Sequence, residues 1–182
     1  MTGRPRIFTV GHSTQDLLGL LGLLRAHGVE ALADVRAHPG SRRMPRFNRE
    51  ELGRELAGRG IGYRHLAELG GRRRPAPGGP NQGWQVEAFR GYADHMASAE
   101  FEAGLERLQA MARERPTAIM CAEGLWWRCH RRLVADALVI RGWEVIHIAP
   151  DGGATAHELT SFAVPDGMRL TYPPAQAPLP PG

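Results

Sequence analysis

Residues 117–148 read TAIMCAEGLWWRCHRRLVADALVIRGWEVIHI, and this stretch decides the fold class. Its first part, 117–121, is an apolar run that is typical of a buried strand. A polar loop follows at 122–128, and residues 129–140 repeat apolar side chains at helical spacing. A second apolar and β-branched run at 143–148 indicates another strand. Strand, helix and strand in this order predict two parallel strands joined by a helical crossover.

The same alternation of strand, turn and helix runs through the N-terminal part of the chain. Expected strands are 7–10, 31–35 and 62–66, and expected helices are 15–27, 48–57 and one or two within 86–114. Ser13 or Thr14 is expected to cap the first helix, and Asn48 the second. This alternation predicts an α/β fold, a single-domain, open, mainly parallel β-sheet flanked by helices. The site is then expected at the carboxyl ends of the strands.

The 182 residues are enough for one domain with a sizeable core. We assign 1–172 to that domain and 173–182 to a Pro-rich tail, and expect a long loop at 70–83, where Gly, Pro and Arg gather. No apolar run reaches the roughly 20 residues that span a bilayer. The basic N-terminus is not followed by a signal-peptide core. We therefore expect a cytoplasmic protein that does not contact a membrane.

The positive charge comes entirely from arginine, because the chain contains 23 arginines and no lysine. Its formal net charge is +4 at pH 7 and its isoelectric point is about 9.8. Arginine suits bidentate capture of carboxylate or phosphate. A lysine-free chain rich in Ala, Gly and Arg is also what a GC-rich genome produces. Composition thus permits nucleic acid as an alternative partner but supports it only weakly. The partner that we expect, a small anionic substrate, follows from the site residues below.

Polar clusters follow the predicted strands at the points where the strands end. Since the carboxyl ends of parallel strands meet at one edge of a sheet, we expect one shared site, although chains turn polar at strand ends in any case. The clusters are Gly11, His12 and Ser13, then Asp34 and Arg36, then His65, and finally Cys121 and Glu123.

The two cysteines, Cys121 and Cys129, are close in sequence. A reducing compartment disfavours a structural disulfide. The two cysteines are therefore interpreted as ligands, as a redox pair, or as one reactive and one buried thiol. Cys129 is expected at the start of a helix near arginines, where the pKa of a thiol falls. The alternative is that both sulfurs simply fill the core.

The residues around the cysteines supply groups for proton transfer. Glu123 is a candidate general acid or base, or else a salt-bridge partner. His130 is a candidate proton carrier, metal ligand or capping residue. Because the spacing of these groups fits no standard zinc site, we assign no metal, and the cofactor stays open. The expected catalytic residues are Cys121, Glu123, Cys129 and His130.

A second group of residues suits anion binding. The Gly11-His12-Ser13 turn offers backbone amides but matches neither a P-loop nor a dinucleotide fingerprint, and Ser13 is more typical of a helix cap than of a nucleophile. The loop after Arg36 carries further arginines, which otherwise form a solvated basic surface. The expected substrate-binding residues are Gly11, His12, Ser13, Asp34, Arg36, Ser41, Arg42, Asn48, Trp126 and Arg131.

Taken in order, these motifs resemble the family called domain of unknown function 488. The matching segments are Thr9-Val10-Gly11-His12-Ser13, Asp34-Val35-Arg36 with Pro39, Ser41, Phe47 and Asn48, then Leu69-Gly70-Gly71, Cys121-Ala122-Glu123 and Cys129-His130-Arg131. The similarity runs from about Ile7 to Ile148. It implies a compact α/β domain with these residues at one site, but no assigned reaction. Trp126 and Trp127 occupy a stretch that varies in the family pattern, where we expect substrate specificity to reside.

The arrangement in which a cysteine begins a loop that leads into a helix is also similar to that of rhodanese-like and cysteine-phosphatase domains. We use this similarity only as an analogy. We expect an enzyme that acts on a small anionic or nucleotide-like ligand through a Cys/Glu/His/Arg site. A cysteine-dependent hydrolase and a cysteine-dependent transferase are the two types that we consider. A nucleic-acid-binding or processing protein is the first alternative, and a metal- or haem-dependent module is the second. The sequence leaves the oligomeric state open.

Overall fold

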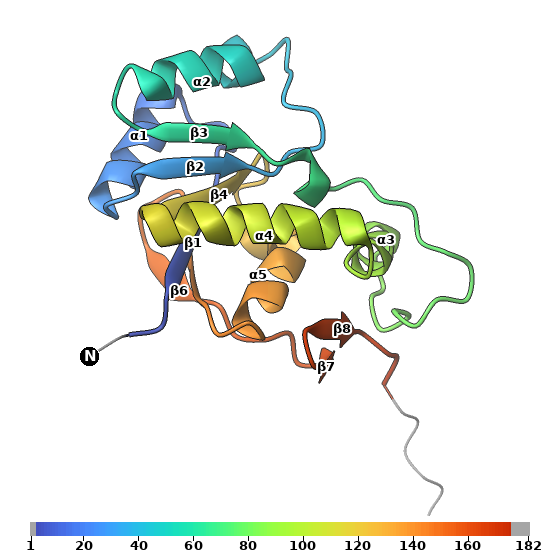
Figure 1. The fold of residues 1–182 in the computed structure, drawn as a ribbon. Coiled ribbons are helices and arrows are strands. Elements are labelled where there is room, and N and C mark those ends of the chain that lie inside the picture. The colour runs from blue at the N-terminus through green and yellow to red at the C-terminus, as the bar shows by residue number, and fades with distance from the viewer. Residues whose placement is uncertain (1–2, 176–182) are drawn as a thin grey trace, which may run out of the picture.

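The computed structural model describes residues 3–175 and shows a six-stranded, mainly parallel sheet flanked by helices (Figure 1). The strands are β1 (Arg6–Gly11), β2 (Ala31–Asp34), β3 (Gly62–His65), β4 (Thr117–Cys121), β5 (Glu144–Ile148) and β6 (Ala154–Ala156). Their order across the sheet is β3-β2-β4-β1-β5-β6, and β6 alone pairs antiparallel. The expected α/β class is thereby confirmed.

Five α-helices cover the two faces of the sheet. They are α1 (Leu17–Ala26), α2 (Arg49–Ala57), α3 (Glu87–His95), α4 (Ala99–Glu114) and α5 (Arg131–Val139). One core cluster joins α1 and α2 to one face, and a second joins the other three helices to the opposite face. In Figure 1, α4 crosses in front of the sheet, whereas α2 lies above β3 and α1 lies at the left of β2 and β3. This division follows from right-handed crossovers, because the chain moves outward from β1 to β3 and then returns to β4 and β5.

The order of the strands opens a crevice beside the end of β4. The chain leaves β4 toward the face covered by α5, whereas it leaves the neighbouring β1 and β2 toward the face covered by α1 and α2. Adjacent connections that diverge in this way create the usual ligand site of an open parallel sheet. The loop 122–128 therefore emerges at the rim of the crevice.

The first helix begins later than expected, and the predicted Ser13 or Thr14 cap was wrong. Asp16 is the N-cap, and its carboxylate accepts a 2.7 Å hydrogen bond from the backbone of Gly19. Ser13 instead donates its backbone N–H to the carbonyl of Ala122 at 2.9 Å, at a positive φ of 47°. Ser13, which the capping rule selected, therefore pairs with the loop after β4 and does not cap the helix.

Helix α5 also begins later than predicted, at Arg131, because Trp126–Arg128 form a 3₁₀ turn before it. Asn48 does precede α2, but its side chain caps no N–H of that helix. Beyond β5, the sequence pattern missed β6 and the hairpin of β7 (Val164–Asp166) and β8 (Arg169–Thr171). These strands have three residues each and are mostly exposed, so they carry no apolar periodicity.

Residues 70–83 contain no helix or strand, as their composition indicated. Of the predicted Pro-rich tail, 176–182 lie outside the described residues. Within residues 3–175, no helix has both the length and the apolar character needed to cross a bilayer.

Candidate functional site

A cavity of about 400 Å³ opens at the carboxyl ends of β2 and β4. Residues after both strands, from the loop at 71–72, from α3 and from the start of α5 line it. All four expected catalytic residues lie in its wall, namely Cys121, Glu123, Cys129 and His130. Of the expected binding residues, Arg36 lines it as well. Segments far apart in sequence therefore meet at this one cavity.

The two cysteines lie side by side in the cavity wall. Cys121 is the last residue of β4, Cys129 lies just before α5, and their sulfurs are 2.7 Å apart. Both residues are almost completely buried, with 3% and 6% of their surfaces exposed. The 3₁₀ turn of the intervening loop returns the chain to the end of β4, which places both sulfurs beside the same cavity.

The environment divides the two thiols into a thiolate and a proton donor. Burial opposes ionisation of Cys129, but the hydrogen bond from Cys121, together with the charges of His130 and Arg131, lowers its pKa well below the ordinary value. Burial raises the pKa of Cys121 well above its ordinary value, and the hydrogen bond and charge of Cys129 raise it further. These opposite shifts favour Cys121 as the donor and Cys129 as the acceptor of the hydrogen bond between the sulfurs.

His130 is oriented by a backbone carbonyl. Its Nε2 lies 2.8 Å from the carbonyl oxygen of Val35, which can only accept, so Nε2 carries a hydrogen. The other ring nitrogen, Nδ1, faces the sulfur of Cys129 at 3.5 Å. The backbone N–H of Arg131 approaches the same sulfur at 3.5 Å. A Cβ at Gly71 would lie 3.0 Å from Nδ1, so glycine lets this loop close over the imidazole.

Arg36 reaches the cavity from a buried ion pair. Its Nε and Nη2 donate to the two carboxylate oxygens of Asp34 at 2.9 and 2.6 Å. Nη2 also donates to the carbonyl of Phe47, and the hydroxyl of Tyr63 donates to Asp34 at 2.7 Å. Asp34 is fully buried and does not line the cavity. Its contribution is to fix the guanidinium of Arg36.

Two exposed arginines at the cavity were absent from the expected binding set. Arg72 and Arg128 both line it, and neither guanidinium forms a hydrogen bond or ion pair within the part of the chain that the structure describes. Arg72 has a positive φ of 62°, a strained conformation for a residue with a side chain. In the sequence, the family motif Leu69-Gly70-Gly71, which directly precedes Arg72, was the feature that pointed to this segment. These cations make the cavity attractive to an anion.

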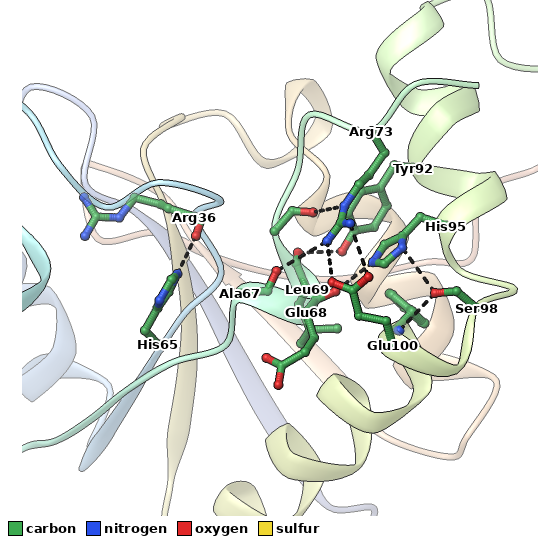
Figure 2. A network of polar contacts seen from close by, with 12 residues as sticks. Arg36, His65, Ala67, Glu68, Leu69, Arg73, Tyr92, His95, Ser98 and Glu100 are labelled. Atoms are coloured by element: carbon green, nitrogen blue, oxygen red, sulfur yellow. Dashed lines mark hydrogen bonds and ion pairs between the residues drawn. The ribbon is translucent and has the colours of Figure 1, made fainter. Parts of the chain in front are cut away.

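The chain before Arg72 is fixed by polar contacts with α3 and α4 (Figure 2). The hydroxyl of Tyr92 donates to the carbonyl of Leu69 at 2.7 Å, and Arg73 donates to Glu100 at 3.1 Å and to the carbonyl of Gly70 at 3.2 Å. On the other side of the view, His65 bonds the carbonyl of Arg36 at 2.7 Å. The three successive arginines at 72–74 are thus not equivalent, because the middle one is engaged.

A buried hydrogen-bond chain lies behind the cavity and was missed by sequence reasoning. Arg131 donates to the hydroxyl of Thr9 at 3.1 Å, and that hydroxyl bonds Nδ1 of His147 at 2.7 Å. His147 Nε2 bonds Nδ1 of His157 at 2.9 Å, and His157 Nε2 bonds the carboxylate of Asp136 at 2.7 Å. Because a guanidinium only donates and a carboxylate only accepts, every link can run in one direction with both imidazoles neutral.

This chain balances two buried charges that do not touch. Arg131 and Asp136 are both fully buried, one at each end of the chain. Burial, followed by the charges of His157 and Arg131, lowers the pKa of His147 to about 2, so this imidazole is neutral. Scattered histidines gave no sequence signal for this network, since its members come from four segments.

Arg131 contributes to the site through the loop after β4 and does not line the cavity. Its Nη2 donates to the carbonyl of Glu123 at 2.6 Å. A Cβ at Gly11 would overlap that same carbonyl oxygen, so glycine is required where the loop meets β1. Trp126 stacks on His147, with ring centroids 4.0 Å apart, and likewise does not line the cavity. All three residues hold the loop in place.

His12 and Ser13 extend the pairing of β1 and β4 beyond the strands. Their backbone N–H groups donate to the carbonyls of Cys121 and Ala122 at 3.0 and 2.9 Å. The ring of His12 stacks on Phe47 at 4.4 Å, and neither His12 nor Ser13 lines the cavity. The structure therefore places these two residues beside the site, where they position the thiol-bearing segment.

The remaining expected binding residues lie in the loop before α2. The backbone of Ser41 donates to the side chain of Asn48 at 2.6 Å, and its hydroxyl accepts from the backbone of Met44 at 3.2 Å. Arg42 is exposed. Ser41, Arg42 and Asn48 do not line the cavity, and the first and last of them shape the loop that follows Arg36.

A second cavity of about 490 Å³ adjoins the first, with which it shares Ala88, Phe89 and Arg128. Its wall is rich in aromatic rings, namely Trp84, Phe89, Trp127 and Phe162. Trp127 is 47% exposed. The site therefore combines a polar part beside the sulfurs with an aromatic part next to it.

The alternative of a metal-dependent module requires a group of side chains that can bind a metal ion. Across residues 3–175, no three side chains of the types His, Cys, Asp and Glu form a group that could hold a metal ion.

Comparison with known proteins places the chain in a family. The family model described as domain of unknown function DUF488 matches residues 17–138, more than half of the chain. This match contains both cysteines and the Asp34–Arg36 pair, while β1 and β5 lie outside it. No curated protein and no solved structure matches the chain. The resemblance seen in the motifs is confirmed, and the protein belongs to the DUF488 family.

Proposed function

We propose that the protein is a cysteine-dependent transferase or hydrolase that acts on a small anionic substrate, with Cys129 as the nucleophile. The observation that carries this proposal is the geometry at the sulfur. Nδ1 of His130 faces Cys129 at 3.5 Å, while Nε2 is held by the carbonyl of Val35. A nucleophile beside a base that a third group orients is the arrangement used in covalent catalysis by cysteine.

The proposed reaction begins with attack by the Cys129 thiolate on an electrophilic atom of the substrate. The leaving group departs with the electron pair of the broken bond and takes a proton from Nδ1 of His130. Water or an acceptor then displaces the substrate fragment from sulfur, and the imidazole accepts the proton that this step releases. The Cys121 thiol stabilises the anion, and the Glu123 carboxylate at the cavity is a second group that can exchange protons.

The charges at the cavity support an anionic substrate. Arg36, Arg72 and Arg128 line it, and the last two are exposed. Planar guanidinium groups bind carboxylate and phosphate bidentately. The adjoining aromatic cavity supports a substrate that joins an anionic group to a flat ring, as in a nucleotide. Reduced sulfurs, which this chemistry requires, suit the expected cytoplasmic location.

Alkylation with iodoacetamide tests the proposal. In the folded protein between pH 6 and 8, we expect Cys129 to be labelled selectively and Cys121 to remain unlabelled, as peptide mass spectrometry would show. AMP and inorganic phosphate should each slow the labelling, and Arg128→Ala should weaken this protection. If Cys129 reacts only after the protein is unfolded, the proposed nucleophile is wrong. Protection that is identical in Arg128→Ala would contradict the assigned anion site.

A further inference from the structure

The proposed nucleophile has a second thiol in direct contact with it, and in the proposed transfer chemistry that thiol forms no covalent bond. The sulfurs of Cys121 and Cys129 are 2.7 Å apart, and both residues line the same cavity. Among residues 3–175, the sulfur of Cys121 makes one other polar contact, a weak 3.5 Å hydrogen bond to the carbonyl of Glu123. Its position therefore calls for a role beyond packing.

The backbone already brings the two sulfurs close enough for a covalent bond. A disulfide bond is about 2.0 Å long, so the sulfurs would need to approach by about 0.7 Å. Cys129 lies between the 3₁₀ turn Trp126–Arg128 and the start of α5 at Arg131, so it is outside regular secondary structure. We expect side-chain rotation together with a small shift of this junction to close the bond.

We infer that Cys121 and Cys129 form a dithiol centre that reduces small anionic disulfides, with Cys129 as the attacking sulfur and Cys121 as the resolving sulfur. This inference rests on the proposed function in one respect, the assignment of Cys129 as the nucleophile of the cation-lined cavity. It adds a two-electron reaction and names disulfides as a substrate class.

The reaction balances in two steps. The Cys129 thiolate attacks one sulfur of the substrate disulfide, the substrate S–S bond breaks, and the first thiolate leaves and takes a proton from His130. The Cys121 thiol then loses its proton to the imidazole and attacks the Cys129 sulfur of the mixed disulfide. The second substrate thiolate leaves with a proton from solvent. The substrate gains two electrons, and the protein ends with a Cys121–Cys129 disulfide.

The charges at the cavity select among disulfides. Arg72 and Arg128 present exposed guanidinium groups beside the sulfurs, and Arg36 adds a third, partly compensated charge. An anionic disulfide is attracted by this field, whereas a cationic one is repelled. Oxidised glutathione and cystamine are suitable probes, because both contain an exposed disulfide but have opposite charge.

The experiment uses the full chain, reduced and kept free of oxygen, and follows its mass after oxidised glutathione is added. We expect the wild-type protein to lose two hydrogens, form the Cys121–Cys129 disulfide and release two molecules of glutathione. Cys121→Ser and Cys121→Ala should stop at a mixed disulfide on Cys129 and release one molecule. Cys129→Ser should not react. Arg72→Ala combined with Arg128→Ala should slow the reaction with glutathione about tenfold and not slow that with cystamine.

The outcomes separate this inference from the proposed function. If wild-type protein accumulates the mixed disulfide as Cys121→Ser does, Cys121 is not a resolving thiol, although alkylation of Cys129 can still support the nucleophile. If Cys129 reacts neither with iodoacetamide nor with the disulfide, both proposals fail. Equal rates with glutathione and cystamine would overturn the charge selection. Circular dichroism of the two Cys121 variants shows whether each retains the fold, and a result from either folded variant decides the point.

Discussion

The imidazole of His130 faces the sulfur of Cys129 across 3.5 Å, with its far nitrogen anchored to a backbone carbonyl. A protonated imidazole at this position favours the thiolate, because opposite charges attract in a buried site. The reactivity of the Cys129 thiol therefore depends on the next residue in the sequence. The orientation of that imidazole in turn depends on the carbonyl of Val35, just after β2.

Replacement of His130 by Gln should raise the pKa of Cys129, since the neutral amide removes a positive charge from beside the thiolate. The rate of iodoacetamide labelling as a function of pH measures this shift. His95→Gln is a matched control, because His95 also bonds a backbone carbonyl through Nε2 but lies away from the sulfurs. A labelling profile that is the same in wild type and His130→Gln would show that the imidazole does not stabilise the thiolate.

Stability should fall as pH drops below about 6.5, the ordinary pKa of histidine. The pKa of His147 is lowered to about 2, so the unfolded chain binds a proton that the folded protein does not. This stability is fully present above pH 6.5 and is lost as pH falls toward 2, by about 1.4 kcal/mol per pH unit. Burial lowers the pKa of His12 and of His95 in the same direction.

Urea unfolding at several pH values between 7.5 and 5 measures this dependence. His147→Gln removes one titrating group, so its free energy of unfolding should change less steeply with pH than that of the wild type. A wild-type free energy that stays constant over this range would contradict the neutral, buried state of His147.

Removal of the Asp34 charge should destabilise the protein by about 3–5 kcal/mol, because Asp34→Asn leaves the guanidinium of Arg36 buried without a counter-charge. Urea unfolding measures the loss. Glu51→Gln is the control, since it breaks an ion pair with Arg54 that lies on the surface of α2. Surface pairs of this kind contribute less than about 1 kcal/mol. Equal losses in the two variants would mean that the Asp34–Arg36 pair is not held in the interior as the structure shows.

The fold was predictable because its apolar runs are local signals. Residues 117–121 form β4 as the sequence indicated, and both faces of the sheet are covered as the strand and helix alternation required. The helix starts were less predictable. Ser13 satisfies the capping rule, but its backbone is used by a distant segment, which no local pattern reveals. Short exposed strands after Ile148 have no buried face and therefore no periodicity.

The sequence predicted the position of the two cysteines at the site, but it did not predict the role of Arg131. Cys121 ends β4, and the short loop after it returns the chain to the same place, so Cys129 lies at the same cavity. Arg131 appeared to be an anion ligand because arginine is usually exposed, yet it is fully buried and donates to Thr9. Its role depends on Thr9, a residue more than a hundred positions away, and only the folded structure brings the two together.

Replacement of Thr9 by Val should interrupt the hydrogen-bond chain that joins Arg131 to His147. The isosteric change leaves a buried guanidinium N–H and a ring nitrogen without partners, at a cost of about 1–3 kcal/mol. Because Arg131 also holds the carbonyl of Glu123, we expect slower alkylation of Cys129 in this variant. Thr117→Val is the control, since it removes another buried hydroxyl that bonds only a nearby carbonyl. Loss of stability in both variants with unchanged labelling in both would restrict the chain to a structural role.

The aromatic cavity should bind the ring of a ligand whose anionic group lies near the sulfurs, and Trp127 is the residue that tests this. It is half exposed in the wall of that cavity, and Arg128 beside it lines both cavities. Anilinonaphthalene sulfonate combines an aromatic system with an anion, and its fluorescence reports binding. Trp127→Ala should weaken its affinity about tenfold, in line with roughly 1–3 kcal/mol for stacking on an aromatic side chain. Leu18→Ala, which removes an exposed apolar side chain on α1, should leave the affinity unchanged, because that helix covers the opposite face of the sheet. If both variants weaken binding equally, the dye binds exposed apolar surface in general, and the ring of the substrate must be sought elsewhere.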